Sequence, residues 1–150
     1  MQWHEPHQHE CFESPHCDCL QIIDFWVNGD TSALSRALTP TRTYHYNGKL
    51  IPGDRRSHVK ALRPFGPVFS DLTGTVGVFT MADSIGAAVT TWTGRHTGTL
   101  CKTGGTGQNV RWVVNCLFRI VDGRIEELWE AWDELGMRRK LGSDVTKCGS

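Results

Sequence analysis

The clearest hydrophobic pattern in the chain lies between Val110 and Ile120. Every second residue there is apolar, and the residues between them are mixed, over eleven positions. This period of two predicts a β-strand with one apolar face. Asp122-Gly123 follows and predicts a hairpin turn, because Gly adopts a left-handed backbone without steric cost. The returning strand, Arg124 to Asp133, carries four carboxylates: Glu126, Glu127, Glu130 and Asp133.

Helical patterns come first in the chain. Ser14-Pro15 is a suitable helix start, apolar residues then recur at helical spacing, and Gly29 ends the segment. Asp30 is suited to cap a second helix that runs through Leu38, and Pro40 is expected to terminate it. A third helix is expected from Gly53-Asp54 to about Pro64. The sequence therefore predicts three N-terminal helices.

Strand patterns dominate the remainder. The expected strands are Thr41–Tyr46, Leu72–Met81, Ile85–Leu100 and the two strands of the hairpin, and a short helix at Glu134–Leu141 closes the fold. Helices followed by a run of strands are typical of an α+β architecture. We expect one strongly curved antiparallel sheet, wrapped over the helices so that a cone-shaped cavity remains.

Composition restricts the biological setting. A chain of 150 residues suits a single domain, and 16 basic residues balance 16 acidic ones, which argues against nucleic acid or an anionic membrane as a partner. We expect no signal peptide and no membrane-spanning segment. The six cysteines are then expected to be thiols in a reducing compartment, and the protein to be cytoplasmic.

The ends of the chain are expected to lie outside the domain. Residues 1–13 form a His- and Cys-rich tail, residues 14–142 the folded domain, and residues 143–150 a polar C-terminal tail. The spacing of the N-terminal His and Cys residues matches no structural zinc pattern, so we expect no metal site there.

Several motifs occur together in a family-specific order. Gly94–Gly98 resembles the Gly-Thr-His-Thr-Gly stretch of SnoaL-like proteins, which are the polyketide cyclase branch of the NTF2-like superfamily. Phe118–Ile125 is similar to the family's central hairpin, and Glu127–Gly136 to its last strand. Trp26–Asp30 is close to the usual end of its first helix. The resemblance covers roughly residues 20–142 and implies an NTF2-like cone.

The resemblance also implies a candidate acid. The catalytic Asp of family cyclases falls on Glu130, which keeps the carboxyl group one methylene further out. Two pocket positions differ from the family pattern, since Leu128 and Cys116 stand where polar residues are usual. The partners that related epoxide hydrolases require are not evident, because the matching positions are Gly94 and His96. The family usually forms homodimers through the outer face of the sheet, and we expect the same here.

The hairpin register decides which way Glu130 points. A two-residue turn pairs Val121 with Arg124 and turns Glu130 away from the apolar face of the preceding strand. A three-residue loop pairs Ile120 with Arg124 and brings Glu130 level with Val114, next to Cys116 on that face. The hydrophobic pattern favours the first geometry and the family resemblance favours the second. We adopt the second.

Three residues are the candidate catalytic groups. An inward Glu130 would have a pKa raised by its apolar surroundings, which suits acid–base work, although a surface glutamate on a long hairpin is the plain alternative. His96 is a candidate proton donor or carbonyl polariser, with a buried structural histidine as its alternative. Asp133 is the reserve acid, or holds the end of the hairpin.

The remaining candidate residues would line a substrate pocket. Tryptophan is abundant, with six residues, and indoles either fill a core or stack on a planar ligand. The expected pocket residues are Trp26, Tyr44, His45, Trp92, Trp112, Val114, Cys116 and Leu128. No neighbouring base or positive charge is evident for Cys116, so a packing role is expected for it.

These observations lead to one functional hypothesis and two alternatives. The hypothesis is a small enzyme without cofactor that cyclises or isomerises an apolar, carbonyl-containing intermediate of polyketide or terpenoid type by proton transfer. The first alternative is a dehydratase or epoxide-opening hydrolase of the same fold. The second is a non-catalytic module for ligand binding or assembly, since fold alone does not fix function.

Overall fold

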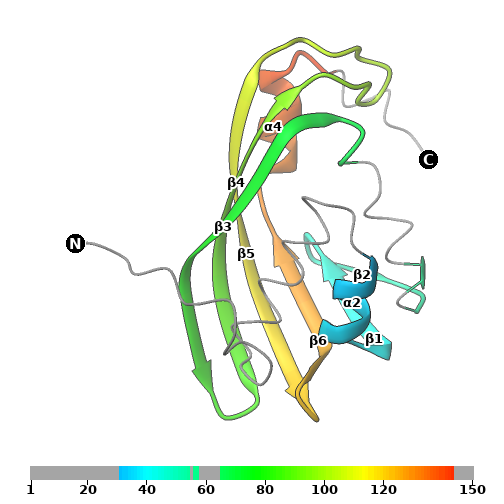
Figure 1. Ribbon diagram of the computed structural model, residues 1–150, viewed down its shortest axis with the longest axis vertical. Coiled ribbons are helices and arrows are strands. Elements are labelled where there is room, and N and C mark those ends of the chain that lie inside the picture. The colour runs from blue at the N-terminus through cyan, green and yellow to red at the C-terminus, as the bar shows by residue number, and fades with distance from the viewer. Residues whose placement is uncertain (1–30, 55, 58–64, 144–150) are drawn as a thin grey trace.

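The structure, a computed structural model, describes residues 31–54, 56–57 and 65–143 (Figure 1). Its helices are α2 (Thr31–Ala37) and α4 (Glu134–Lys140). Its strands are β1 (Leu38–Tyr46), β2 (Lys49–Ile51), β3 (Phe69–Ala82), β4 (Ile85–His96), β5 (Asn109–Val121) and β6 (Arg124–Ala131). The helix predicted after Ser14-Pro15 and most of the helix predicted after Gly53 lie outside the described residues.

The six strands form a single sheet in the order β2-β1-β6-β5-β4-β3. The sheet is mixed, because β1 runs parallel to β6, whereas all other neighbours are antiparallel. The prediction of a wholly antiparallel sheet is therefore wrong. The reason is that β1 and β6 are far apart in the sequence, so no local turn dictates their relative direction.

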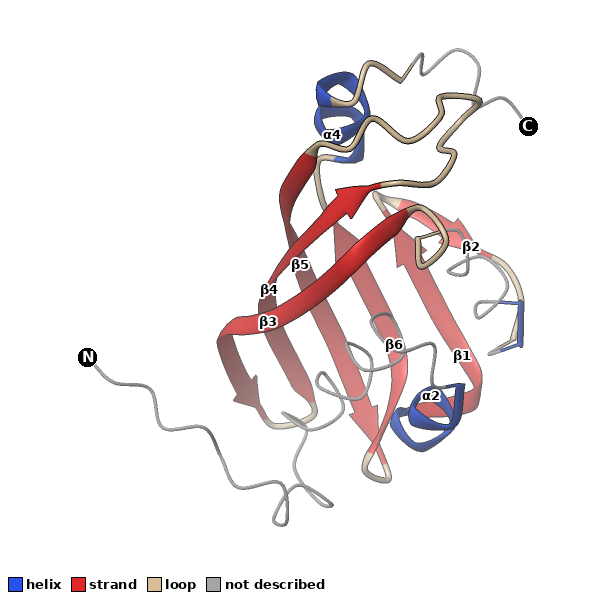
Figure 2. Cartoon of the chain, turned by 45° about the horizontal axis from the view of Figure 1, so that its top comes forward, coloured by secondary structure: helices blue, strands red, loops and turns tan. Residues whose placement is uncertain are grey.

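The sheet is curved, and the two described helices lie at its opposite ends (Figures 1 and 2). Helix α2 lies near β1 and β6, and α4 follows the end of β6. One face of the sheet, which we call the inner face, carries the buried apolar residues. They form two clusters, one around Phe118 and Leu128 and the other around Trp92 and Val114.

Several predicted boundaries differ from those of the structure. The second helix ends at Ala37 rather than Leu38, and β1 starts directly at Leu38 and includes Pro40. Pro40 is tolerated because it falls in the gap between Leu38 and Thr43 where the pairing of β1 with β6 is interrupted. Strand β4 ends at His96, four residues before the predicted end at Leu100.

The hairpin between β5 and β6 combines a tight turn with a β-bulge. Asp122 and Gly123 both have positive φ angles, 49° and 72°, as a two-residue type I′ turn requires, and Val121 pairs with Arg124. The predicted three-residue loop is therefore wrong. The ladder then shifts by one residue, because Arg119 pairs with Glu127. Glu126 is the extra residue on β6.

The bulge decides which side chains of β6 face the core. Ile125 and Leu128 are both buried although they are three residues apart, which a regular strand with a period of two does not allow. Beyond the bulge, Glu130 pairs with Cys116 and lies on the inner face. Glu130 therefore faces inward as expected. It lies level with Cys116 rather than with Val114, because neither turn considered from the sequence included the bulge at Glu126.

Of the two cysteines that the structure describes, one departs from the expected thiol state. Cys101, in the loop after β4, is disulfide-bonded, whereas Cys116 on β5 is a free thiol. Within the described residues, no helix combines the length and apolar character needed to cross a bilayer.

Candidate active site

Glu130 is the buried carboxyl of the inner face. Glu130 is the second-last residue of β6, and only 9% of the residue is exposed. Leu128 on the same strand and Val114 on β5 are buried nearby, and both belong to the apolar clusters. A carboxyl group in such surroundings must find a hydrogen-bond partner or remain protonated.

Tyr44 supplies that partner. The parallel pairing of β1 with β6 sets Tyr44 against Leu128 and Tyr46 against Glu130, and the Tyr44 side chain lies on the inner face. Its hydroxyl donates a hydrogen bond of 2.5 Å to Oε2 of Glu130. Burial, followed by the negative charge of Glu130, raises the pKa of Tyr44 far above its usual range. The phenol therefore stays protonated and acts as a fixed donor.

Opposing influences act on the acidity of Glu130. Burial raises the pKa of this carboxyl, because the charged form loses its hydration. The hydrogen bond from Tyr44 and the positive charge of Arg42 act in the opposite direction. Burial has the largest effect, so the pKa of Glu130 remains raised, as is common for carboxyl groups at catalytic sites.

Oxygen Oε1 of Glu130 has a different neighbour from Oε2. Cys116 lies opposite on β5, and its Sγ is 4.0 Å from Oε1. Cys116 is half-buried and in contact with both apolar clusters. Because Tyr44 holds Oε2, Oε1 is the oxygen with more freedom to meet a substrate.

A second tyrosine–carboxylate pair lies beside the first. Tyr46 donates a hydrogen bond of 2.6 Å to Oε2 of Glu134, the first residue of α4. Arg138, one helical turn further on, donates from Nε to Oε1 of Glu134 at 2.9 Å. Burial, and then the hydrogen bond to Glu134, raises the pKa of Tyr46 well above its usual range. The Tyr44 and Tyr46 rings are 6.1 Å apart, so the two pairs are neighbours.

The segment that carries Glu130 is tied to the end of β1. The backbone N–H of Asn47 donates to the carbonyl oxygen of Glu130 at 2.8 Å. The Asn47 side-chain oxygen accepts a hydrogen bond of 2.9 Å from the backbone N–H of Trp132. These bonds hold Glu130 between β1 and β5 and fix its backbone position.

An aromatic cluster continues from Glu130 towards α4. Trp132 follows Glu130 by two residues, about 7 Å along the chain. Its ring is 5.9 Å from that of Trp112, which in turn stacks on Trp92 at 6.4 Å and an interplanar angle of 12°. Phe65 and Phe69 also contact Trp112. Of the predicted pocket tryptophans, Trp92 and Trp112 belong to this cluster, and Trp26 lies outside the described residues.

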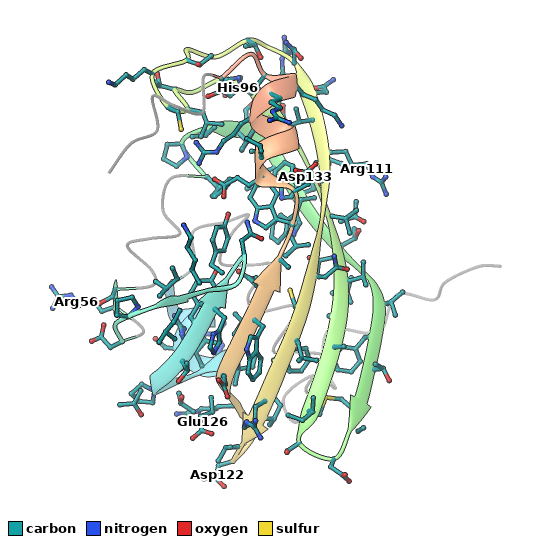
Figure 3. The ribbon with its side chains drawn as sticks, turned by 180° about the vertical axis from the view of Figure 1, so that it is seen from behind. Arg56, His96, Arg111, Asp122, Glu126 and Asp133 are labelled. Atoms are coloured by element: carbon teal, nitrogen blue, oxygen red, sulfur yellow. The ribbon has the colours of Figure 1, made fainter. Side chains whose placement is uncertain are left out.

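His96 lies on the inner face but away from Glu130 along the sheet. Glu130 pairs with Cys116 on β5, and Cys116 pairs with Ala88 on β4. His96 is eight residues beyond Ala88 on β4, which corresponds to about 26 Å of extended strand. The structure therefore does not bring the predicted acid–base pair together. Figure 3 shows His96 near α4, at the end of the sheet opposite to Asp122.

The surroundings of His96 indicate a structural role. The ring is fully buried, and its Nδ1 accepts a hydrogen bond from the backbone N–H of Thr106 at 3.3 Å and lies 3.0 Å from the Thr106 hydroxyl. Burial lowers the pKa of His96, so the ring is held neutral. The loop packs closely, because a Cβ at Gly98 or Gly105 would lie 2.0 Å or 2.2 Å from a backbone oxygen. His96 thus holds this loop in place.

Two other candidates lie elsewhere. His45 is on the outer face, where its Nε2 is 3.0 Å from Oε1 of Glu127 and its ring stacks on Trp129 at 5.1 Å. Asp133 is exposed and caps α4, since its Oδ1 accepts a hydrogen bond of 2.7 Å from the backbone N–H of Gly136. Neither side chain reaches the Glu130 carboxyl, because each is engaged with other partners.

Arg42, Tyr46 and Glu134 belong to the site but were not predicted from the sequence. A signal for the first two was present, because the alternation that puts Tyr44 on one face of β1 also puts Arg42 and Tyr46 there. Glu134 follows the predicted strand and had no such signal. Among the residues that the structure describes, no three His, Cys, Asp or Glu side chains gather in a way that suits a metal ion.

Comparison with known proteins identifies the family. The curved mixed sheet with its helices matches an NTF2-like α+β fold. The model of the SnoaL-like polyketide cyclase family matches residues 19–141. The chain therefore belongs to the SnoaL-like polyketide cyclase family. The search of curated proteins found no match.

Solved structures share the fold. IdmH from Streptomyces antibioticus, a proposed polyketide cyclase, is 23% identical with a TM-score of 0.76, over 91% of this chain and 99% of that one. AclR from Streptomyces galilaeus, a proposed hydroxylase, is also 23% identical, with a TM-score of 0.75 over 85% and 80%. TsrD from Streptomyces laurentii is 20% identical, with a TM-score of 0.74 over 93% and 100%. Likeness at these identities establishes the shared fold.

Proposed function

We propose that this protein is a cofactor-independent acid–base enzyme that cyclises or isomerises an apolar, carbonyl-containing intermediate. The single observation that supports this most is the buried Glu130 carboxyl, which is oriented by Tyr44 and surrounded by apolar side chains. Membership of the SnoaL-like polyketide cyclase family supports the same class of substrate.

Each step of the reaction is assigned to an atom. Ionised Glu130 accepts a proton from the carbon next to the substrate carbonyl through Oε1, which leaves an enolate. In cyclisation, the enolate carbon bonds to a second carbonyl carbon of the same molecule, and Glu130 returns the proton to the alkoxide oxygen. In isomerisation, the proton returns to a different carbon. Tyr44 keeps Oε2 occupied and stabilises the ionised form, so the proton moves at Oε1.

The aromatic cluster gives the substrate a planar surface. Trp132 and Trp112 follow Glu130 along the inner face, and stacking on indole rings favours flat ring systems. The proposed substrate places its carbonyl-bearing end at Glu130 and its apolar body against these rings. His96 serves the loop that follows β4 and takes no part in proton transfer.

Deuterium exchange on a probe ketone tests the proposal. The probe is 2-tetralone, a bicyclic ketone, and proton NMR in D₂O follows the replacement of its α-protons. A positioned general base contributes about 10²–10⁴-fold, so wild type should exceed the buffer rate clearly. Glu130→Gln should reduce the rate to that of buffer. Glu127→Gln is the matched control, because Glu127 is on the same strand but contacts His45 and Arg119.

Binding measurements separate an enzyme from a binding module. Quenching of tryptophan fluorescence by 2-tetralone should be the same in wild type and Glu130→Gln. An enzyme loses exchange and keeps binding in this variant. A wild-type protein that binds the probe without accelerating exchange would contradict the proposed reaction and favour the binding module.

We also propose a homodimer formed through the outer face. Val113 and Leu117 on β5 are exposed there, at 38% and 43%, beside the stacked His45 and Trp129. Leu117→Glu should give a monomer in light scattering. Leu135→Glu is the control, since Leu135 has the same 43% exposure but lies on α4. A wild-type monomer at micromolar concentration overturns this proposal.

A further inference from the structure

Arg42 is a buried cation on the inner face of β1. Only 5% of the residue is exposed, and arginine is rarely buried to this extent without a specific role. Unlike lysine, arginine does not lose its proton when it is buried, so a positive charge is fixed in the core. This charge lies two residues from Tyr44 on the same strand face.

The geometry connects Arg42 to Glu130 through one aromatic ring. The guanidinium carbon of Arg42 lies 6.0 Å from the centroid of the Tyr44 ring. The hydroxyl of that ring donates to Oε2 of Glu130 at 2.5 Å. A cation near an aromatic ring draws electron density from it, which makes the phenol a stronger hydrogen-bond donor. Arg42, Tyr44 and Glu130 therefore form a continuous series of cation, ring and carboxyl.

We propose that Arg42 is a positioning residue for Glu130: it lets the carboxyl ionise inside the apolar core, directly by its charge and indirectly through the hydrogen bond from Tyr44. This inference rests on the proposed function, and it names the residue that makes Glu130 usable as a base. Without Arg42, burial would hold Glu130 in its protonated form, which accepts no proton.

Apart from Tyr44 and Arg42, the groups near Glu130 are neutral or paired with another residue. Cys116 from β5 is a thiol at 4.0 Å. Tyr46 from β1 is a neutral phenol whose hydrogen bond goes to Glu134, and Glu134 is paired with Arg138 on α4. The positive charge of Arg42 acts together with Tyr44 against the effect of burial, which remains larger. Among the described groups, Arg42 is thus the cation that assists ionisation of Glu130.

A titration of the Glu130 carboxyl tests this assignment without a substrate. The protein is labelled with ¹³C at the glutamate carboxyl, and the Glu130 signal is identified by its loss in Glu130→Gln. Arg42→Met removes the charge and keeps an apolar side chain. Its Glu130 titration midpoint should move to higher pH than in wild type, and Arg42→Lys, which keeps a charge, should move it much less. Arg119→Met is the control, because Arg119 lies 3.5 Å from Glu127.

The same variants connect the titration to proton transfer. At a fixed pH below the Glu130 midpoint of wild type, the rate of 2-tetralone exchange should be at least about tenfold lower in Arg42→Met. The reason is that a nearby opposite charge typically changes the acidity of a group by at least a factor of ten. The rate of the variant should recover as the pH is raised. A purely structural role would lower the rate at every pH and leave the midpoint unchanged. If Arg42→Met does not fold, Arg42→Gln is measured in its place.

The outcomes are distinguishable from those for the proposed function. An unchanged Glu130 midpoint in the folded neutral variant, or an equal shift in Arg42→Lys and Arg42→Met, overturns the role of the Arg42 charge. This holds even if wild type exchanges the probe. Conversely, a shifted midpoint in a protein that exchanges no probe supports the role of Arg42 and contradicts the proposed function.

Discussion

The hydrogen bond from Tyr44 to Glu130 leads to a prediction that stability measurements can test. Tyr44→Phe removes the hydroxyl and keeps the buried ring. The bond is 2.5 Å long and both residues are buried, so the lost bond is not replaced by bulk water. A hydrogen bond to a charged group typically contributes about 1.5–3 kcal/mol, and one between neutral groups about 0.5–1.5 kcal/mol.

The cost of Tyr44→Phe depends on the charge of Glu130 and therefore on pH. Burial raises the folded-state pKa of Glu130. The stability that depends on this group is fully present below the unfolded pKa of about 4.3 and is lost as pH rises through the folded pKa. Removing the Tyr44 donor raises the folded pKa further, so the variant loses more stability at high pH. We expect a cost of about 0.5–1.5 kcal/mol at pH values where Glu130 is neutral, and about 1.5–3 kcal/mol once the pH is high enough to ionise it.

Urea unfolding followed by tryptophan fluorescence measures this difference at each pH. Tyr46→Phe is the matched variant, because Tyr46 is on the same strand face and its hydroxyl bonds Glu134 instead. The increase between the two pH ranges should be larger in Tyr44→Phe. Equal pH trends in the two variants, or a cost in Tyr44→Phe that does not grow with pH, would refute the assignment of this bond to an ionising Glu130.

Three further predictions concern the other candidate groups. His96→Ala should destabilise the protein by about 2–4 kcal/mol, since it removes a buried ring and the acceptor for Thr106, but 2-tetralone exchange should persist in the folded variant. Burial lowers the pKa of His96, so the folded state favours the neutral ring. The wild-type protein should therefore lose stability as the pH falls below about 6.5. His96→Ala should not show this decrease. Asp133→Ala should lower the free energy of unfolding in urea by about 1 kcal/mol, because α4 loses its N-terminal cap. This variant should exchange 2-tetralone at the wild-type rate. A complete loss of exchange would restore Asp133 as a catalytic candidate. Finally, dialysis against EDTA should leave exchange unchanged, and a loss restored by a divalent cation would contradict a cofactor-independent reaction.

The sequence alone determined the local elements of this protein. The alternation along Val110–Ile120 became β5, and the turn predicted at Asp122-Gly123 is present, although it has two residues and not the three of the loop we adopted. These features were readable because strand periodicity and turn conformation depend on residues adjacent in the chain. The motifs that resemble the SnoaL-like family are likewise local, and the family match over residues 19–141 agrees with them.

The composition of the candidate site was decided by tertiary structure. A bulge at Glu126, driven by burial of both Ile125 and Leu128, set the face of Glu130, and no turn type encodes it. The parallel pairing of β1 with β6 brought Tyr44 to within 2.5 Å of Glu130 across 86 residues of sequence. It also made Arg42 a neighbour of the carboxyl.

The distance between His96 and Glu130 was also set by the tertiary structure. His96 and Glu130 share the inner face, as their strand positions suggest, but the sheet is long enough to hold them in different environments. Strand periodicity determines the face on which a side chain lies, because the backbone repeats every two residues. It does not determine which distant strand lies alongside or at what register, because those depend on the packing of the whole core.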